Sequence, residues 1–84
     1  MRKPAEWMQM PTDDRILEVL DSGLELGPAA IAHNIDRTRS WVSQRLSVLV
    51  EYGLVTEAKP GYYGLTDDGR RYLAGELDAS TLDN

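Results

Sequence analysis

The side chains most suited to binding a partner lie in residues 38–52, on one face of a predicted helix. The apolar residues of this stretch recur at the spacing of a helix face that lies on a core: Val42, Leu46, Leu49 and Val50. The opposite face bears hydroxyls, an amide and cations, with no carboxylate before Glu51: Arg39, Ser40, Ser43, Gln44 and Ser47, flanked by Arg37 and Arg45. Such a surface, rich in donors and free of acids, suits phosphates and the edges of nucleic-acid bases.

The hydrogen-bonding capacity of these side chains divides them into two groups. Arginine can make two bonds to guanine O6 and N7, and glutamine can make two bonds to adenine N6 and N7. We therefore predict base contacts near the helix start, from Arg39, Ser40, Ser43 and Gln44. We predict contacts to the DNA backbone from Arg37, Thr38, Arg45, Ser47 and Lys59. The alternatives are an ordinary solvated helix face and, for the cations, surface ion pairs worth less than about 1 kcal/mol.

The charge of the chain is unevenly distributed. The 84 residues carry a net charge of −5, which argues against a nucleic-acid-binding module because such modules are usually basic. Between Arg37 and Arg71, however, six basic residues stand against four acidic ones, while the flanks hold three basic and ten acidic residues. The local balance therefore favours DNA binding, and the alternative is simply the acidic surface of a small protein.

No part of the sequence has the spacing of a catalytic or metal site. The chain has no cysteine, which excludes disulfides, thiolate nucleophiles and Cys-ligated zinc. Its single histidine, His33, has no cysteine or acidic cluster near it. The pairs Asp13-Asp14 and Asp67-Asp68 are explained as first turns of helices, where the helix dipole favours carboxylates. We therefore predict no catalytic residue, no metal and no cofactor, and a protein that is not an enzyme.

The N-terminal part predicts an arm followed by two helices. Residues 1–11 contain two prolines and read as an extended arm. The first helix is expected at about 13–22, with Thr12 as its N-cap, and the second at about 28–34 after Gly27-Pro28. Between them, residues 24–26 alternate apolar and polar side chains and are compatible with a single short edge strand.

The C-terminal part predicts one long helix, a β-hairpin and a last helix. Thr38 is a good N-cap for helix 38–52, which is expected to stop at Gly53. Two short strands flank the Pro60-Gly61 turn signal, and Thr66 caps a helix that reaches about Leu77. The predicted fold is mainly α with a small β-hairpin, an α+β fold in the order helix, helix, helix, strand, strand, helix. It divides into an arm (1–11), a folded domain (12–77) and a weakly determined tail (78–84).

This order and several motifs resemble a known family. The segments Ala30-Ile31-Ala32-His33-Asn34-Ile35, Thr38 to Leu46 and Leu49-Val50-Glu51-Tyr52-Gly53-Leu54-Val55 are similar to winged helix-turn-helix transcriptional regulators of the multiple-antibiotic-resistance type. Leu65-Thr66-Asp67-Asp68-Gly69 is similar to their entry into the last helix. With the acidic balance, the chain most resembles the small halophage-repressor-like proteins of halophilic archaea. Trp41 departs from the pattern, since many relatives carry a smaller residue or tyrosine there.

The resemblance implies a sequence-specific DNA-binding transcriptional regulator, a repressor, with double-stranded DNA as its partner. Helix 38–52 would enter the major groove, and the wing at 56–64 would lie on the flanking backbone or minor groove. The alternative is a winged-helix module that docks protein and binds no DNA. A halophilic source would explain the acidity, because molar salt shortens the Debye length to about 3 Å and screens self-repulsion.

We also predict a homodimer, because one helix-turn-helix covers only a half-site. Apolar residues outside the expected core are assigned to its interface: Trp7, Met8, Met10, Leu77 and Leu82. Trp41 has two open roles, half-buried against the second helix or pressed on the sugar-phosphate backbone. With neither a membrane-spanning run nor a signal peptide, a cytoplasmic location is expected, and no small-molecule ligand is evident.

Overall fold

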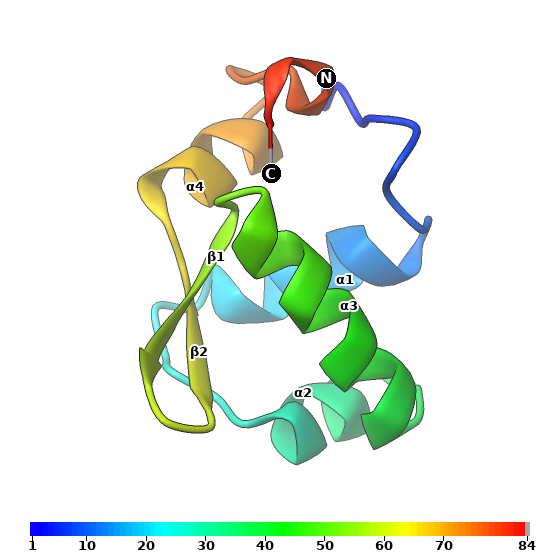
Figure 1. Cartoon of the computed structure of the whole chain (residues 1–84), viewed down its shortest axis with the longest axis vertical. Helices are drawn as coiled ribbons and strands as arrows, with labels where there is room; N and C mark the ends of the chain where they lie inside the picture. The colour runs from blue at the N-terminus through cyan, green and yellow to red at the C-terminus, as the bar shows by residue number, and fades with distance from the viewer. Residues whose placement is uncertain (84) are drawn as a thin grey trace.

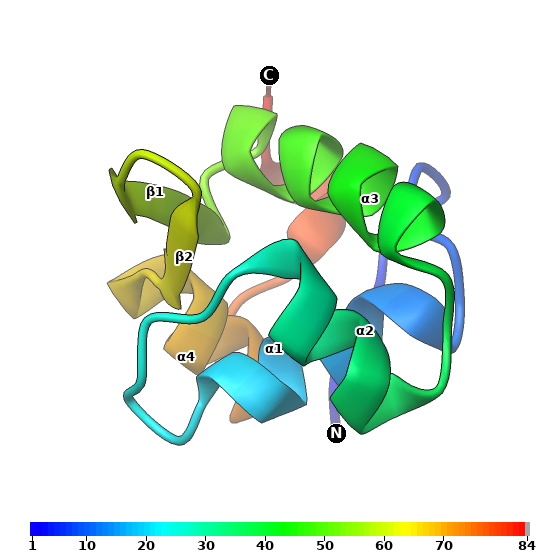
Figure 2. The same ribbon diagram turned by 90° about the horizontal axis from the view of Figure 1, so that it is seen from below.

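Four α-helices and a two-stranded antiparallel hairpin make up the protein, whose computed structural model describes residues 1–83 (Figure 1). The elements are α1 (Thr12–Leu20), α2 (Pro28–Ile35), α3 (Arg39–Glu51), β1 (Val55–Lys59), β2 (Tyr62–Leu65), α4 (Asp67–Leu73) and a 3₁₀ turn, η1 (Ala79–Thr81). The predicted fold class and element order are confirmed. Figure 2 shows α3 along the outer edge of the molecule, with the hairpin beside it and α1 and α2 beneath.

Two threonine caps define where α3 and α4 begin. The Thr38 hydroxyl accepts a hydrogen bond from the Trp41 amide at 3.2 Å, as expected of an N-cap. The Thr66 hydroxyl accepts from the Gly69 amide at 3.0 Å and donates to the Gly53 carbonyl at 2.6 Å. Thr66 therefore ties the start of α4 to the chain that leaves α3.

The start of α1 differs from the prediction. Thr12 lies inside the helix and Pro11 occupies the cap position, without a side-chain cap. The Asp13 carboxylate accepts instead from the Gln9 amide, at 3.0 Å, and so holds the chain that enters the helix. The helix ends at Leu20, two residues before the predicted end.

A single residue of segment 24–26 joins the hairpin. Leu26 and Tyr63 form an isolated antiparallel bridge, and each amide donates to the other's carbonyl at 2.9 Å. Residues 24–26 are thus too short to form the full edge strand, but they fasten the α1–α2 connection to β2. Within the hairpin, Val55 pairs with Leu65 and Lys59 with Tyr62, and the register shifts between Glu57 and Lys59.

The core draws on every helix, the hairpin and both ends of the described chain. Met8 of the arm and Leu77 and Ala79 near the C-terminus are buried in it, and Leu82 packs against it. The arm and the tail therefore both pack on the folded domain, at Met8, Ala79 and Leu82; Asn84 of the predicted tail lies outside the described residues. Val50 was expected on the buried stripe of α3, but it is exposed.

Gly69, in the first turn of α4, lies close to Leu54 and Leu65. An added Cβ would overlap the Leu54 carbonyl oxygen and lie 2.5 Å from Leu65 Cδ1. Gly69→Ala is therefore expected to destabilise the fold by about 1–3 kcal/mol, because backbone would have to move. Gly64→Ala is the matched control, since its Cβ would meet only Glu25 Cγ, at 3.7 Å. Urea denaturation measures both, and equal effects would contradict this account of Gly69.

Candidate nucleic-acid interface

The outer face of α3 remains available for a partner. Arg39, Ser40, Gln44 and Ser47 are exposed and Ser43 is partly buried. Within residues 1–83, the side chains of Arg39, Ser40 and Gln44 form no hydrogen bond or ion pair, whereas the Ser47 hydroxyl donates to the Ser43 carbonyl at 3.2 Å. An unpaired guanidinium and amide on a helix face can therefore bind an external acceptor without first breaking an internal contact.

The turn before α3 places Arg37 beside this face. Asp36 adopts a left-handed conformation, with φ of 57°, and closes α2. The Arg37 side chain is exposed and donates one hydrogen bond, from Nη1 to the Asp36 carbonyl at 3.1 Å. Its remaining donors stay available, which suits the predicted backbone contact.

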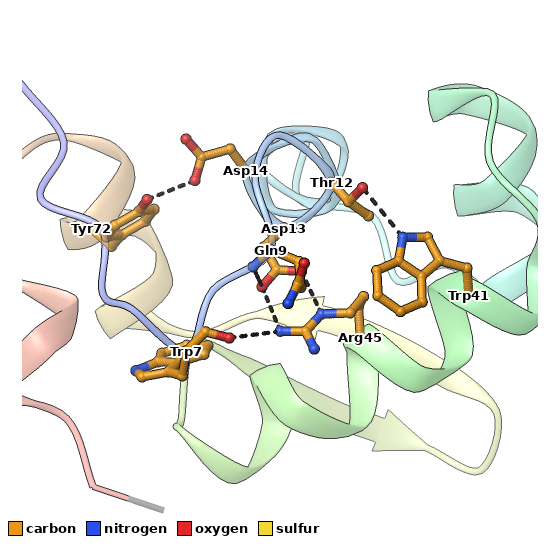
Figure 3. A network of polar contacts seen from close by, with 8 residues as sticks. All are labelled: Trp7, Gln9, Thr12, Asp13, Asp14, Trp41, Arg45 and Tyr72. Atoms are coloured by element: carbon orange, nitrogen blue, oxygen red, sulfur yellow. Dashed lines mark hydrogen bonds and ion pairs between the residues drawn. The ribbon is translucent and has the colours of Figure 1, made fainter.

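Arg45 has a different role from the one predicted. Its side chain is directed into the protein and only 10% exposed, and it binds the fully buried Asp13 carboxylate with two parallel bonds. Nε donates to Asp13 Oδ1 and Nη2 to Oδ2, both at 2.9 Å (Figure 3). The carboxylate raises the pKa of the guanidinium, against the opposing effect of burial. Arg45 is thus occupied inside the protein, and we withdraw it as a DNA contact.

A sequence signal for this pair exists in the helical spacing. Asp13 completes an i, i+3, i+4, i+7 set with Ile16, Leu17 and Leu20, all buried in α1. Arg45 completes the same kind of set with Val42, Leu46 and Leu49 in α3. Two opposite charges, each placed on an apolar stripe, indicate a buried ion pair between the two helices.

Trp41 is partly buried and contacts α1 through its indole nitrogen. Its Nε1 donates to the Thr12 hydroxyl at 3.3 Å, and the Arg45 guanidinium carbon lies 5.6 Å from its ring centroid (Figure 3). The ring is partly buried, so part of it still faces solvent at the start of α3.

The hairpin tip carries one exposed cation and one exposed acid. Lys59 Nζ lies 4.9 Å from the ring centroid of Tyr62, which is exposed, while Tyr63 is partly buried, as the alternation along a strand predicts. The Glu57 carboxylate accepts from the Gly61 amide at 2.9 Å and so braces the turn. The stacked position leaves the Lys59 ammonium free to reach a phosphate.

Arg70 and Arg71 are engaged on their own helix. They pair with Asp67 and Asp68 at 3.0 and 3.3 Å, respectively. Both pairs are exposed and contribute little to stability.

Comparison with known proteins decides the family. The family model described as winged helix-turn-helix phage repressor matches residues 1–84. The chain belongs to this family. It is 47% identical over 88 residues to a protein named "Repressor protein" from Halobacterium phage phiH, with 99% of this chain and 98% of that protein covered. The crystal structure of the PhiH1 repressor-like protein from Haloarcula marismortui superimposes with a TM-score of 0.86 at 34% identity, covering 98% and 94% of the two chains.

Membership in the phage repressor family confirms the winged-helix fold and the resemblance drawn from the motifs. It also makes the chain a regulatory protein of the repressor class and not an enzyme. Among residues 1–83, no three His, Asp or Glu side chains gather where they could hold a metal ion, and no described helix is long and apolar enough to cross a membrane.

Most apolar residues assigned to a dimer interface lie instead within this family member's own fold. Trp7 stacks on Tyr52, with ring centroids 3.8 Å apart and planes 7° apart. Met8 and Leu77 are buried and Leu82 is partly buried, which leaves Met10, 44% exposed, as the one residue of the five with a large free surface. The reasoning that placed all five outside the core was therefore wrong.

An open apolar groove lies next to Met10. Its volume is about 600 Å³, and it is lined by Met1, Arg2, Pro4, Met10, Pro11, Asp14, Leu73 and Ala74. Figure 3 shows Asp14 on the side of α1 that faces away from α3, bonded to the Tyr72 hydroxyl. At Asp14, the groove therefore lies on a different side of α1 from α3.

Proposed function

We propose that the chain is a sequence-specific transcriptional repressor that inserts α3 into the major groove of double-stranded DNA. The hairpin would lie on the flanking backbone or minor groove. The observation that carries this proposal is the acid-free outer face of α3, on which Arg39 and Gln44 have no partner within residues 1–83. A protein-docking module would have no need of unpaired donors at the start of this helix, so DNA accounts for them better.

The contacts divide into base-reading and positioning groups. Arg39, Ser40, Ser43 and Gln44 lie in the first half of α3, which is the part that meets base edges in helix-turn-helix proteins. Phosphates would be held by the side chains at the turn, on the outer helix face and at the hairpin tip: Arg37, Thr38, Lys59 and Ser47, whose hydroxyl would first leave the Ser43 carbonyl. This division predicts that sequence discrimination and salt dependence reside in different residues.

The acidity of the chain fits a protein that works in concentrated salt. Its net charge is −5, and its relatives come from a halobacterial phage and from Haloarcula marismortui. Molar salt screens self-repulsion but also weakens phosphate contacts through lost counterion release. We therefore infer a halophilic protein that depends relatively more on base contacts, and a cytoplasmic one because its proposed ligand is DNA.

Selection from a random DNA pool at low and at molar KCl tests the function. We expect enrichment of one sequence class at both salt concentrations, with a higher ratio of specific to random binding at molar salt. Retention of no DNA at either salt concentration would overturn the proposal and favour the docking module.

The hairpin contact has its own test in Lys59→Ala. Affinity for selected and random DNA should fall by similar factors, and the slope of log affinity against log salt should become shallower by about one unit, since one phosphate contact is lost. Lys3→Ala is the matched control, because Lys3 is exposed on the arm near Asp78 and not on the hairpin. An unchanged slope would exclude Lys59 as a phosphate contact, as would a Lys3 variant with the same effect. Titrations by fluorescence anisotropy at four salt concentrations supply the slopes.

We further propose a homodimer, with the apolar groove around Met10 at its interface. The proposal is supported by the need for two half-site readers and by the position of the groove, away from α3. Light scattering at tens of micromolar protein should give twice the mass of one chain. The Met10→Asp variant should give a mass closer to that of a single chain. Leu24→Asp is the matched control, since Leu24 is 62% exposed and does not line the groove. A monomer mass for the wild type at low and high salt would contradict the dimer.

A further inference from the structure

We propose that the buried Asp13–Arg45 pair is a positioning device that holds α3 at the angle and depth required for base readout. This inference rests on the proposed function. It concerns how α3 is held and not which of its residues touch DNA.

Both oxygens of the Asp13 carboxylate and two nitrogens of the Arg45 guanidinium are hydrogen bonded. Each Asp13 oxygen accepts from Arg45 at 2.9 Å, and Oδ2 also accepts from the Gln9 amide at 3.0 Å. Arg45 Nη2 donates in addition to the Trp7 carbonyl at 3.2 Å (Figure 3). A carboxylate with no exposed surface is therefore connected to α3, to its own helix α1 and to the arm.

The geometry of the pair restricts the movement of α3. Apolar side chains tolerate small slides and rotations between packed helices, because their contacts have no preferred direction. Two parallel hydrogen bonds between a planar guanidinium and a carboxylate tolerate much less, since both bonds must keep their length and angle. Arg45 directly follows Gln44 and lies within one turn of Ser43, so any rotation that this fork prevents is a rotation of the base-reading side chains.

Stability alone does not account for the pair. Replacing a buried ion pair by well-packed apolar residues is often neutral or stabilising, because desolvation of the charges offsets their attraction. A binding site, in contrast, requires its groups within about 0.5 Å of the productive geometry, which favours a directional contact beneath α3. We call the Asp13–Arg45 ion pair, in this role, the lock. Buried pairs are also screened less by salt than exposed ones, so the lock would persist where phosphate contacts weaken.

The double variant Asp13→Leu with Arg45→Met tests the inference by removing the lock while keeping the volume apolar. We expect a thermal midpoint near that of the wild type and a loss of about tenfold or more in the ratio of selected to random DNA affinity, at low and at molar salt. The double variant Asp67→Leu with Arg70→Met is the matched control, because it replaces an exposed ion pair on α4 in the same way. It should leave both the midpoint and the ratio unchanged.

A folded lock variant that discriminates DNA as well as the wild type would overturn the inference. Should that variant fail to fold, Arg45→Lys keeps the charge but cannot form both parallel bonds, and the same loss of discrimination is expected of it. Full discrimination by this variant would overturn the inference.

Residual dipolar couplings of the free proteins measure the α1–α3 angle without DNA. A changed angle in the lock variant supports the inference, and an unchanged angle overturns it. If the wild type itself does not discriminate selected from random DNA, the proposed function is overturned. The α1–α3 angle would still show whether the ion pair positions α3.

Discussion

Asp13→Ala is expected to lower the free energy of unfolding by about 3–5 kcal/mol, because it leaves the Arg45 guanidinium buried without its partner. Domains of this size are stable by only about 5–15 kcal/mol, so a large part of the stability would disappear. The Arg45 side chain is 10% exposed, and the acceptor that would remain for its hydrogen bonds among residues 1–83 is the Trp7 carbonyl, at 3.2 Å. Urea denaturation monitored by tryptophan fluorescence measures the change.

The control for this prediction is Asp67→Ala. Its ion pair with Arg70 is 3.0 Å long, but the Asp67 side chain is 98% exposed, so the expected loss is below about 1 kcal/mol. Similar losses for Asp13→Ala and Asp67→Ala would show that the buried pair is not a structural requirement. Breaking the pair is thus expected to destabilise the fold, whereas replacing both members should leave its stability nearly unchanged. The difference separates the penalty of an unpaired buried charge from the contribution of the pair.

The second large effect concerns base recognition by Arg39 and Gln44. Substituting either residue by alanine should cost roughly 1–3 kcal/mol on the selected site and much less on random DNA. The double variant should lose about 2–6 kcal/mol on the selected site if the two residues read separate base pairs. Both side chains are exposed and unpartnered within residues 1–83, so stability should change little.

Arg37→Ala is the matched arginine control for these variants. Arg37 lies in the turn before α3 and is assigned to phosphate, so its loss should weaken selected and random DNA alike. Competition titrations with both DNAs give the ratio of selected to random DNA affinity for each of the four variants. A uniform loss for Arg39→Ala and Gln44→Ala would reduce these residues to backbone contacts.

Local signals in the sequence were sufficient for the elements that carry the interface. The threonine caps of α3 and α4, the Pro60-Gly61 turn and the 3.6-residue period of α3 each depend on a few neighbouring residues. Such features are readable because their physics is short-range. The same signals indicated the fold class and the element order, although the ends of α1, α2 and α3 were displaced by one or two residues. The last helix, α4, ends at Leu73, four residues before the predicted end at Leu77.

The role of Arg45 depended on long-range contacts that local reading did not weigh. An arginine on a donor-rich helix favours phosphate when only its neighbours are considered, yet its partner Asp13 lies 32 residues earlier. The explanation of Asp13-Asp14 as a helix start was correct for α1 but incomplete, because it overlooked that Asp13 lies on the apolar stripe of that helix. Charged residues on a buried stripe should therefore be examined as pairs between helices.

The packing partners of the arm and the tail could not be predicted, because their apolar residues follow neither a helical nor a strand periodicity. Trp7, Met8, Leu77 and Leu82 are apolar, and composition alone does not distinguish burial in their own fold from burial against a second copy. The arm and the tail are held by contacts between residues far apart in the sequence, as in the stack of Trp7 on Tyr52 and the bridge between Lys3 and Asp78. The dimer proposal now depends on the groove near Met10.

The central claim is that the outer face of α3 reads base edges in the major groove, and a double-mutant cycle between protein and DNA tests it most directly. Guanines of the selected site are replaced one at a time by 7-deazaguanine, which removes the N7 acceptor while base pairing remains. We expect at least one position where this replacement weakens DNA binding by the wild type by about 1–3 kcal/mol and does not change binding by the Arg39→Ala variant. Equal losses in both proteins at every guanine, or no loss at any, would contradict base readout by Arg39.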